Sequence, residues 1–443
     1  MDNLEKKIHE YTKSGALPMH MPGHKRNPAM VPGLYVDEDI TEVFGFDNLH
    51  RPEGIIKDTE EKAASIWNAK SAIISVNGAT APILASVMAA ASRGRILVGA
   101  NCHVSVWHAL ELSDASYEVL VPETDESFPF CLDIDPAKIA SMLDKGPDIK
   151  TVIITSPTYE GIVSDIKAVR AVTSPRDVAL IVDESHGAHF GLNEYFPSSS
   201  RADLVIKSIH KTLHAPTQTA VLLTYSEKIP EEHVRHYMDI FESSSPSYIL
   251  MSGISRVFTD IKNDLNITER WTDALKKCRE DLSRGLLHLK LSEYAGADPS
   301  KLVIICGGVI NGTDLSLLLR EEGIETEAAF DTHIIAMTGI GDTNESLSRF
   351  TNTLLKIDSK LEGRISGAFG KSVPDDEPQI VLPVKSAVTA PYEILPSSNC
   401  EGRISADYAY KYPPGIPILI PGQIITKNRL DHLNAQSLKV LRG

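Results

Sequence analysis

Short apolar segments alternate with helical patterns along the first half of the chain. A helical pattern over residues 58–69 is followed by an apolar strand over 71–76, a turn that contains Gly78, and a second helix over 82–92. The alternation continues with strands predicted over 95–98, 117–121, 151–155 and 179–183 and a helix over 104–113. Short strands separated by helices are typical of a mainly parallel, doubly wound sheet, so the pattern predicts an α/β protein.

The second half of the chain is organised differently. Two more strands, over 204–208 and 220–224, precede a long helical region over 246–291. Beyond it, a smaller α/β pattern is predicted from strands over 302–306 and 333–337 and helices over 313–322 and 343–361. We therefore predict four parts: an N-terminal arm and loop (1–60), a large domain (61–250), a helical linker (251–292) and a smaller C-terminal domain (293–443).

Composition narrows the class of protein. The chain has 443 residues, 42% hydrophobic and 23% charged, as in a folded soluble protein of two or three domains. Its net charge of -15 argues against nucleic acid or an anionic membrane as the main partner and favours a cationic substrate. Five scattered cysteines without a CxxC pair predict neither a disulfide framework nor a thiolate zinc site. With no export signal and no apolar run near the ~18 residues of a membrane span, we expect a cytoplasmic protein.

Polar residues follow several of the predicted strands. Asp183 ends the strand 179–183, Lys211 comes shortly after the strand 204–208, and Thr80 lies in a turn between a strand and a helix. Ligands of open α/β sheets bind outside the carboxyl ends of the strands, and a helix N-terminus suits a phosphate. Each feature alone is a weak signal, because such an Asp usually caps a helix and such a Lys usually lies on the surface. Together, a phosphate turn, a carboxylate and a lysine are the groups that hold pyridoxal 5'-phosphate.

Ten ordered segments of the sequence match the motifs of one enzyme family. They are residues 20–25 (HMPGHK), 39–42 (DITE), 47–50 (DNLH), 77–78 (NG), 101–105 (NCHVS), 156–161 (SPTYEG), 183–189 (DESHGAH), 208–211 (SIHK), 244–248 (SSPSY) and 412–417 (YPPGIP). On these segments nearly the whole chain resembles the Orn/Lys/Arg decarboxylases. The resemblance implies the aspartate aminotransferase-like fold of type I pyridoxal-phosphate enzymes and decarboxylation of arginine, lysine or ornithine, with arginine slightly favoured. The length matches shorter members of the family, which lack an extra N-terminal domain.

The resemblance also implies roles for individual residues. Lys211 forms the covalent link to the cofactor aldehyde, Asp183 contacts the pyridinium nitrogen, and His103 stacks on the ring. His103 and Lys211 are the two alternatives for the group that protonates Cα. The other implied cofactor contacts are Ala79, Thr80, His186, Ser208 and His210. Ser244 and Ser245 match a segment that contacts the phosphate of the neighbouring subunit, so the resemblance implies a homodimer or higher assembly with shared active sites.

One position departs from the family. After Asn77 and Gly78, members commonly have consecutive hydroxyl residues, whereas here Thr80 stands between Ala79 and Ala81. One lost hydroxyl contact costs about 1 kcal/mol, so backbone amides are expected to bind more of the phosphate.

A basic substrate side chain needs an acidic partner to offset the cost of burying its charge. The candidates are Glu42, Asp47, Glu53 and Asp407. Asp407 stands where the family often has glutamate, and the missing methylene would admit a longer substrate or a bidentate guanidinium. An equally good interpretation of Asp407 is a solvated surface acid.

Other functions fit parts of the sequence. An aminotransferase or another lyase would use the same cofactor groups, with Arg403 as a candidate for holding the substrate carboxylate, although the surrounding GRIS sequence also matches the decarboxylases. A metal hydrolase would use His186, His189, His210 and His214, which are spaced i, i+3 and i, i+4. A non-catalytic binding protein on this fold would form no covalent bond with the cofactor.

Overall fold

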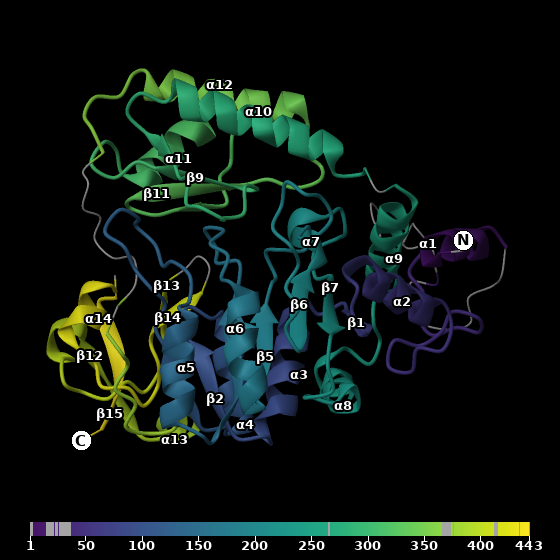
Figure 1. Cartoon of the computed structure of the whole chain (residues 1–443), viewed down its shortest axis with the longest axis horizontal. Helices are drawn as coiled ribbons and strands as arrows, with labels where there is room; N and C mark the ends of the chain where they lie inside the picture. Colours follow the sequence, from purple (N-terminus) through teal and green to yellow (C-terminus); the bar gives the residue numbers. More distant parts are fainter. Residues whose placement is uncertain are drawn as a thin grey trace. The chain divides into compact units, whose positions relative to one another are not determined.

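The computed structural model confirms the predicted α/β fold, with a large mixed sheet (Figure 1). The structure describes residues 3–14, 22, 25, 37–264, 266–365, 374, 376–411, 415–433 and 435–442. Most of the 20–25 segment and residues 412–414 of the YPPGIP segment therefore lie outside the described residues.

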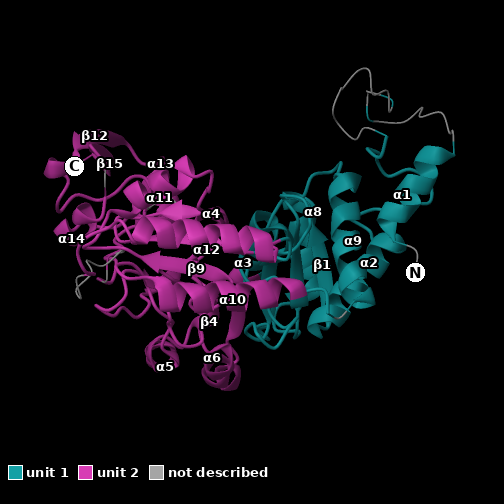
Figure 2. Ribbon diagram, turned by 90° about the horizontal axis from the view of Figure 1, so that it is seen from above, with its two compact units in different colours: residues 1–89, 184–269, 339–341 teal, residues 90–183, 270–338, 342–443 magenta. Residues whose placement is uncertain are grey.

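The chain divides into two compact units (Figure 2). Unit 1 contains residues 1–89, 184–269 and 339–341, and unit 2 contains residues 90–183, 270–338 and 342–443. Each unit combines segments that are far apart in the sequence, and the strands of the large sheet are divided between them. The four parts predicted from the sequence stay a prediction.

Unit 1 contains an antiparallel group of strands from the large sheet. In order, they are β1 (Ser71–Ser75), β7 (Ala220–Thr224) and β6 (Leu204–Ser208). Their apolar sequences are buried almost throughout, as expected for strands covered on both faces. Ala220, the first residue of β7, pairs with both Ser75 and Ser208. The carboxyl ends of β1 and β6 therefore lie at the same edge of the sheet.

Helices of unit 1 pack against these strands and against one another. They are α1 (Leu4–Lys13), α2 (Ile55–Trp67), α7 (Ile209–Thr212), α8 (Glu231–Phe241) and α9 (Tyr248–Asn263), and α3 (Thr80–Ala91) follows β1. Helix α2 packs on β1 and on α9 through a stripe that includes buried Ile56, Ala63 and Trp67. Helix α1 packs on α9, next to the chain N-terminus (Figure 1).

Unit 2 contains the parallel strands of the large sheet. In order, they are β5 (Ala179–Asp183), β4 (Ile149–Thr155), β2 (Arg95–Gly99) and β3 (Tyr117–Leu120). The helices between them are α4 (Val104–Ser113), α5 (Pro136–Lys145), α6 (Ile166–Thr173) and the short 3-10 helix η1 (Ser174–Arg176). Because these strands are parallel, their carboxyl ends lie at one edge of the sheet, where ligands of open α/β sheets bind.

A second, antiparallel sheet of unit 2 is covered by helices (Figure 1). Its strands, in order, are β10 (Ala328–Ala329), β11 (His333–Met337), β9 (Lys301–Ile305) and β8 (Lys290–Leu291). The helices are α10 (Glu269–Gly285), α11 (Gly312–Glu321) and α12 (Asn344–Asp358). Helices α10 and α12 are in contact, with the Thr351 hydroxyl 3.1 Å from Cys278 Sγ.

The C-terminal part of unit 2 contains two small antiparallel sheets. Its elements are α13 (Val384–Thr389), β12 (Tyr392–Pro396), η2 (Ser397–Asn399), β13 (Ala409–Lys411), β14 (Ile416–Leu419), α14 (Lys427–Asp431) and β15 (Ser437–Leu441). Strand β12 pairs with β15 and β13 with β14 around a core that includes Cys400, Ile425 and Val440.

Several predicted elements match the structure residue for residue, among them β5, β6, β7, β11 and α4. The helical region predicted over 246–291 is two helices, because the chain leaves helical geometry at Asp264 (φ -132°, ψ 98°). There the Asp264 carboxylate accepts the backbone N–H of Asn266 at 2.9 Å, an Asx turn that competes with the helix.

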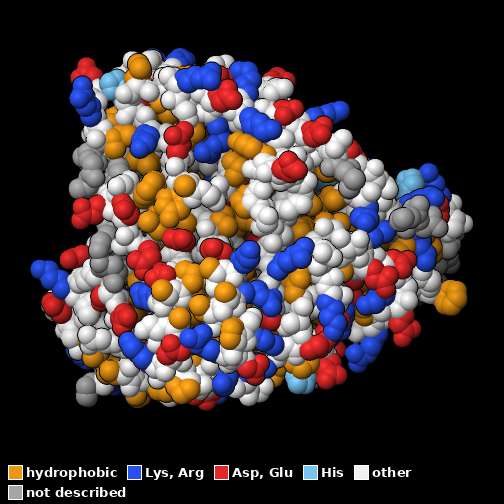
Figure 3. Space-filling view, viewed as in Figure 1, with side chains coloured by type: hydrophobic (Ala, Val, Ile, Leu, Met, Phe, Trp, Pro, Cys, Tyr) orange, Lys and Arg blue, Asp and Glu red, His pale blue; other side chains and the backbone are white. Residues whose placement is uncertain are grey.

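The surface in Figure 3 interleaves acidic and basic side chains with apolar ones, and that face carries no continuous basic patch. In the described part of the chain, no helix has both the length and the apolar character needed to cross a membrane. All five cysteines are buried as free thiols.

Candidate active site

The turn after β1 has the features of a phosphate-binding turn. Gly78 adopts a positive φ of 68° and donates its N–H to the carbonyl of Gln218 at 2.8 Å. A Cβ at Gly78 would make only an ordinary contact, 3.9 Å from the backbone nitrogen of Thr80, so the positive φ and not the space favours glycine here. Thr80 is exposed and begins α3, whose first N–H groups have no acceptor within the helix. Ala79 and Thr80 therefore fit a phosphate group.

Lys211 lies just beyond β6, at the same edge of the unit 1 strands as this turn. Its side chain is partly buried, and its Nζ lies 2.9 Å from His186 Nε2. Ser208, the last residue of β6, is buried. His210 donates Nδ1–H to the carbonyl of Thr219 at 3.0 Å, and burial lowers the pKa of His210. The SIHK segment therefore places the Lys211 amine beside the His186 imidazole.

The histidines considered for a metal site have other partners. His189 is fully buried, with Nδ1 3.2 Å from the Thr212 hydroxyl and its ring against Phe190 and Phe196. His214 Nε2 lies 3.1 Å from Asp260. No group of three metal-ligating side chains occurs among the residues that the structure describes.

A buried ion pair that the sequence analysis did not identify lies beside these residues. Lys207 and Glu184 are fully buried and paired, and Lys207 Nζ also donates to the carbonyl of Gly187 at 2.8 Å. The other Glu184 oxygen accepts the N–H of Ser200 at 2.8 Å. The pair joins the DESHGAH segment to β6. A signal was present in the sequence, because a lysine inside an apolar strand requires a partner.

Asp183 and His103 belong to unit 2. Asp183 ends β5 and is 3% exposed, and its carbonyl accepts the N–H of Ser156 at 3.0 Å. Burial, reinforced by the nearby Asp183 charge, raises the pKa of the Cys102 thiol to about 12. His103 caps α4 and accepts the N–H of Ser105 on Nδ1 at 3.2 Å, so its neutral ring carries the proton on Nε2.

Two of the four candidate substrate acids already have partners. Asp47 accepts backbone N–H groups from Glu53, Gly54 and Ile56 at 2.8–3.0 Å, at the start of α2. Burial alone would raise the Asp47 pKa, but these hydrogen bonds together lower it. Asp407 is partly exposed and pairs with Lys439 at 2.6 Å. Glu42 and Glu53 are exposed, and no hydrogen bond or ion pair joins their carboxylates to the described residues.

Ser244 and Ser245 are exposed in the segment that follows α8. Arg403, the candidate carboxylate ligand of an aminotransferase, is bonded to Glu393 and to the carbonyl of Leu441, each at 2.7 Å. Its guanidinium is therefore engaged within the C-terminal sheets.

Comparisons with known proteins find matches to one enzyme family. A family model described as Orn/Lys/Arg decarboxylase, major domain, matches residues 3–295, and one described as Orn/Lys/Arg decarboxylase, C-terminal domain, matches residues 376–439. A protein named arginine decarboxylase from Bacillus anthracis is 28% identical over 96% of this chain and 90% of its own length. A protein named lysine decarboxylase LdcA from Pseudomonas aeruginosa is 22% identical over 96% of this chain and 74% of its own.

Solved structures resemble the fold. The Francisella novicida lysine decarboxylase LdcF has a TM-score of 0.84 at 17% identity and covers 99% of this chain and 81% of that one. The ureidoglycine-glyoxylate aminotransferase of Bacillus subtilis has a TM-score of 0.54 at 17% identity, and the match covers 69% of this chain and 84% of the aminotransferase chain. These likenesses confirm the predicted fold class.

Proposed function

Because the chain belongs to the Orn/Lys/Arg decarboxylase family, we propose that it decarboxylates a basic amino acid with pyridoxal 5'-phosphate bound to Lys211. The observation that carries the proposal is the Lys211 amine, partly buried beside His186 at the edge where β1 and β6 end. Arginine is the first candidate substrate, because several relatives that match more than nine-tenths of this chain are named arginine decarboxylase.

The residues present fit the cofactor. When bound, pyridoxal phosphate supplies an aldehyde that condenses with an amine and a ring that draws electrons from Cα. Lys211 supplies the amine, and Ala79 and Thr80 offer open amides and a hydroxyl to the phosphate, with Ser208, His210 and His186 as further contacts. Asp183, buried at the end of β5, is the carboxylate proposed for the pyridinium nitrogen.

Proton positions follow from the hydrogen bonds. Lys211 Nζ lies 2.9 Å from His186 Nε2, within hydrogen-bonding distance. His103 holds its proton on Nε2 because Nδ1 accepts from Ser105. Lys211 and His103 are the two candidates for protonating Cα. Replacing His103 by Gln, which leaves Lys211 in place, and measuring amine release distinguishes them: near-complete loss of amine would assign the proton to His103, and retained amine release would assign it to Lys211.

For the basic end of the substrate, we propose Glu42 and Glu53 ahead of Asp47 and Asp407. The support is that Asp47 and Asp407 are already hydrogen-bonded, whereas the carboxylates of Glu42 and Glu53 are exposed and have no hydrogen bond or ion pair with the described residues. The exposure of Ser244 and Ser245 supports a homodimer in which each subunit contributes them to its neighbour.

A substrate panel tests the proposal. Purified protein with pyridoxal phosphate is incubated with arginine, lysine or ornithine, and carbon dioxide, amine and keto acid are measured. We expect equal amounts of carbon dioxide and amine, abolished in Lys211→Ala and retained in the surface variant Lys145→Ala. A keto acid without carbon dioxide would instead establish an aminotransferase.

A further inference from the structure

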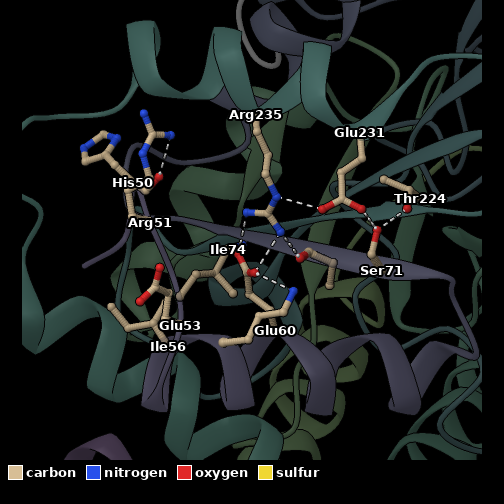
Figure 4. Close-up of polar contacts among 12 residues, drawn as sticks. His50, Arg51, Glu53, Ile56, Glu60, Ser71, Ile74, Thr224, Glu231 and Arg235 are labelled. Carbon is tan, nitrogen blue, oxygen red and sulfur yellow. Dashed lines mark hydrogen bonds and ion pairs between the residues drawn. The ribbon is translucent and has the colours of Figure 1, made fainter. Parts of the chain in front are cut away.

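A glutamate–serine hydrogen bond joins helix α8 to strand β1 near each end of the helix. Glu231, in the first turn of α8, contacts Ser71 at the start of β1 (Figure 4). Glu242, directly after α8, contacts Ser75 at the end of β1. From Glu231 to Glu242 the helix rises about 16 Å, and from Ser71 to Ser75 the strand rises about 13 Å. The two glutamates are therefore spaced similarly to the two serines.

Between these two contacts, Arg235 of α8 forms an ion pair with Glu60, a buried glutamate of α2. Its Nε donates to Glu231 at 2.7 Å and its Nη2 donates to Glu60 at 2.9 Å (Figure 4). Glu60 is 1% exposed. The position of α8 is therefore fixed from its first turn to its end.

The Glu242 contact lies at the phosphate turn. The Ser75 hydroxyl donates to the carbonyl of Gly78 at 2.9 Å and accepts the N–H of Asn77 at 3.3 Å. The Asn77 side-chain amide donates to the carbonyl of Phe241 at 2.9 Å. Ser75 and Asn77 therefore bind the turn to the end of α8, and Glu242 contacts the hydroxyl at the centre of these bonds.

Glu242 is buried beside this hydroxyl. Glu242 is 7% exposed, and burial raises its pKa even though Ser75 opposes the shift. The Ser75 hydroxyl donates toward a carboxyl oxygen of Glu242 as well as toward the carbonyl of Gly78, so the two groups share this one hydroxyl. The Glu242 side chain also lines a cavity of about 20 Å³, room for one water molecule.

On its other side, Glu242 is followed by the segment 243–245. The carbonyl of Ser243 accepts from His50 Nε2 at 2.9 Å, and His50 Nδ1 lies 3.1 Å from Asp239 of α8. These bonds fix the direction in which the chain leaves α8, and hence the position of exposed Ser244 and Ser245.

We propose that Glu242 is a positioning residue that holds the phosphate turn of its own subunit and sets Ser244 and Ser245 for the neighbouring subunit. The inference rests on the proposed function, because both segments act through the cofactor phosphate. It makes Glu242 a physical link between the two phosphate sites of a dimer.

Cofactor affinity tests the inference, with Glu231→Ala as the matched control on the same helix and strand. Apo enzyme is titrated with pyridoxal phosphate and the dissociation constant is read from absorbance, and the unfolding temperature of the apo form is recorded. We expect Glu242→Ala to raise the dissociation constant about tenfold, the effect of about one lost hydrogen bond. Glu231→Ala is expected to lower the unfolding temperature but to leave the dissociation constant within about twofold.

Conservative variants keep the test decisive if Glu242→Ala does not fold. Glu242→Gln keeps a side-chain oxygen that accepts from Ser75 and is expected to retain wild-type affinity, whereas Ser75→Ala is expected to weaken binding as Glu242→Ala does. Wild-type affinity in both Glu242→Ala and Ser75→Ala, alongside a wild type that binds the cofactor, would overturn the inference. A wild type that binds no cofactor would instead refute the proposed function.

Hybrid dimers test the link between subunits. Wild-type subunits are paired with Lys211→Ala subunits, or with subunits that carry both Lys211→Ala and Glu242→Ala, so that only the wild-type subunit reacts. The second hybrid is expected to need several times more pyridoxal phosphate for half-maximal activity. Equal requirements in the two hybrids would show that Glu242 does not act on the neighbouring site.

Discussion

Replacing Arg235 by Met tests the buried charges that hold α8 in place (Figure 4). The change leaves Glu60, 1% exposed, without its guanidinium partner, and removes one partner of Glu231. Breaking a buried pair by removing one partner costs about 3–5 kcal/mol. For 443 residues, an unfolding entropy of about 2 cal/mol/K per residue converts each kcal/mol to about 1 °C, so we expect a loss of about 3–5 °C in the unfolding temperature.

The pH dependence of this loss has a definite sign. Burial raises the pKa of Glu60, although Arg235 opposes the shift. An acid whose pKa is raised by folding destabilises the protein when ionised, so its cost applies above the folded pKa and disappears as the pH falls. The Arg235→Met defect is therefore expected to be larger at pH 8 than at pH 5.5 in thermal scans. Replacing Glu60 by Met as well should recover most of the loss. A double variant as unstable as the single one would refute this reasoning.

Three further experiments have defined outcomes. Asp47→Ala removes the hydrogen-bond acceptor at the start of α2 and should lower the free energy of unfolding in urea by about 1 kcal/mol. Because folding lowers the Asp47 pKa, the stabilisation by the Asp47 carboxylate is present at neutral pH and is lost as the pH falls below about 4. Lys207→Met leaves Glu184 buried and unpaired and should lower the yield of folded protein in gel filtration, with recovery when Glu184 is also Met. Glu42→Gln and Glu53→Gln should raise KM for the basic amino acid more than they lower kcat, measured by amine release, and an unchanged KM in both would remove them as substrate ligands.

The sequence was most informative where burial and local pattern agree. Strands β5, β6 and β7 are short apolar runs buried along their whole length, so their bounds could be read directly. Helix α1 was missed because only Leu4 and Ile8 are buried among charged residues, which is too few to show a period. Helix α8 was missed for the same reason, with only Val234 and Met238 buried.

In the candidate site, too, residues with a local sequence signal could be predicted, and residues whose contacts depend on the tertiary fold could not. Lys211 and Asp183 could be identified because each stands at the end of an apolar strand and within a family motif. The role of Glu242 could not, because its contact with Ser75 spans 167 residues and exists only once α8 lies along β1. Asp47, predicted as a substrate ligand, has hydrogen bonds of a helix cap, which depend on the path of the loop from Asp47 to Gly54.

The most direct test of the proposed reaction combines trapping with product analysis. Holoenzyme is reduced with borohydride and digested, and the modified peptide is identified by mass spectrometry, while carboxyl-labelled arginine is supplied to unreduced enzyme. We expect the pyridoxyl group on Lys211 and release of the label as carbon dioxide in equal amount to the amine. An unmodified Lys211, or label retained in a keto acid, would contradict the assignment.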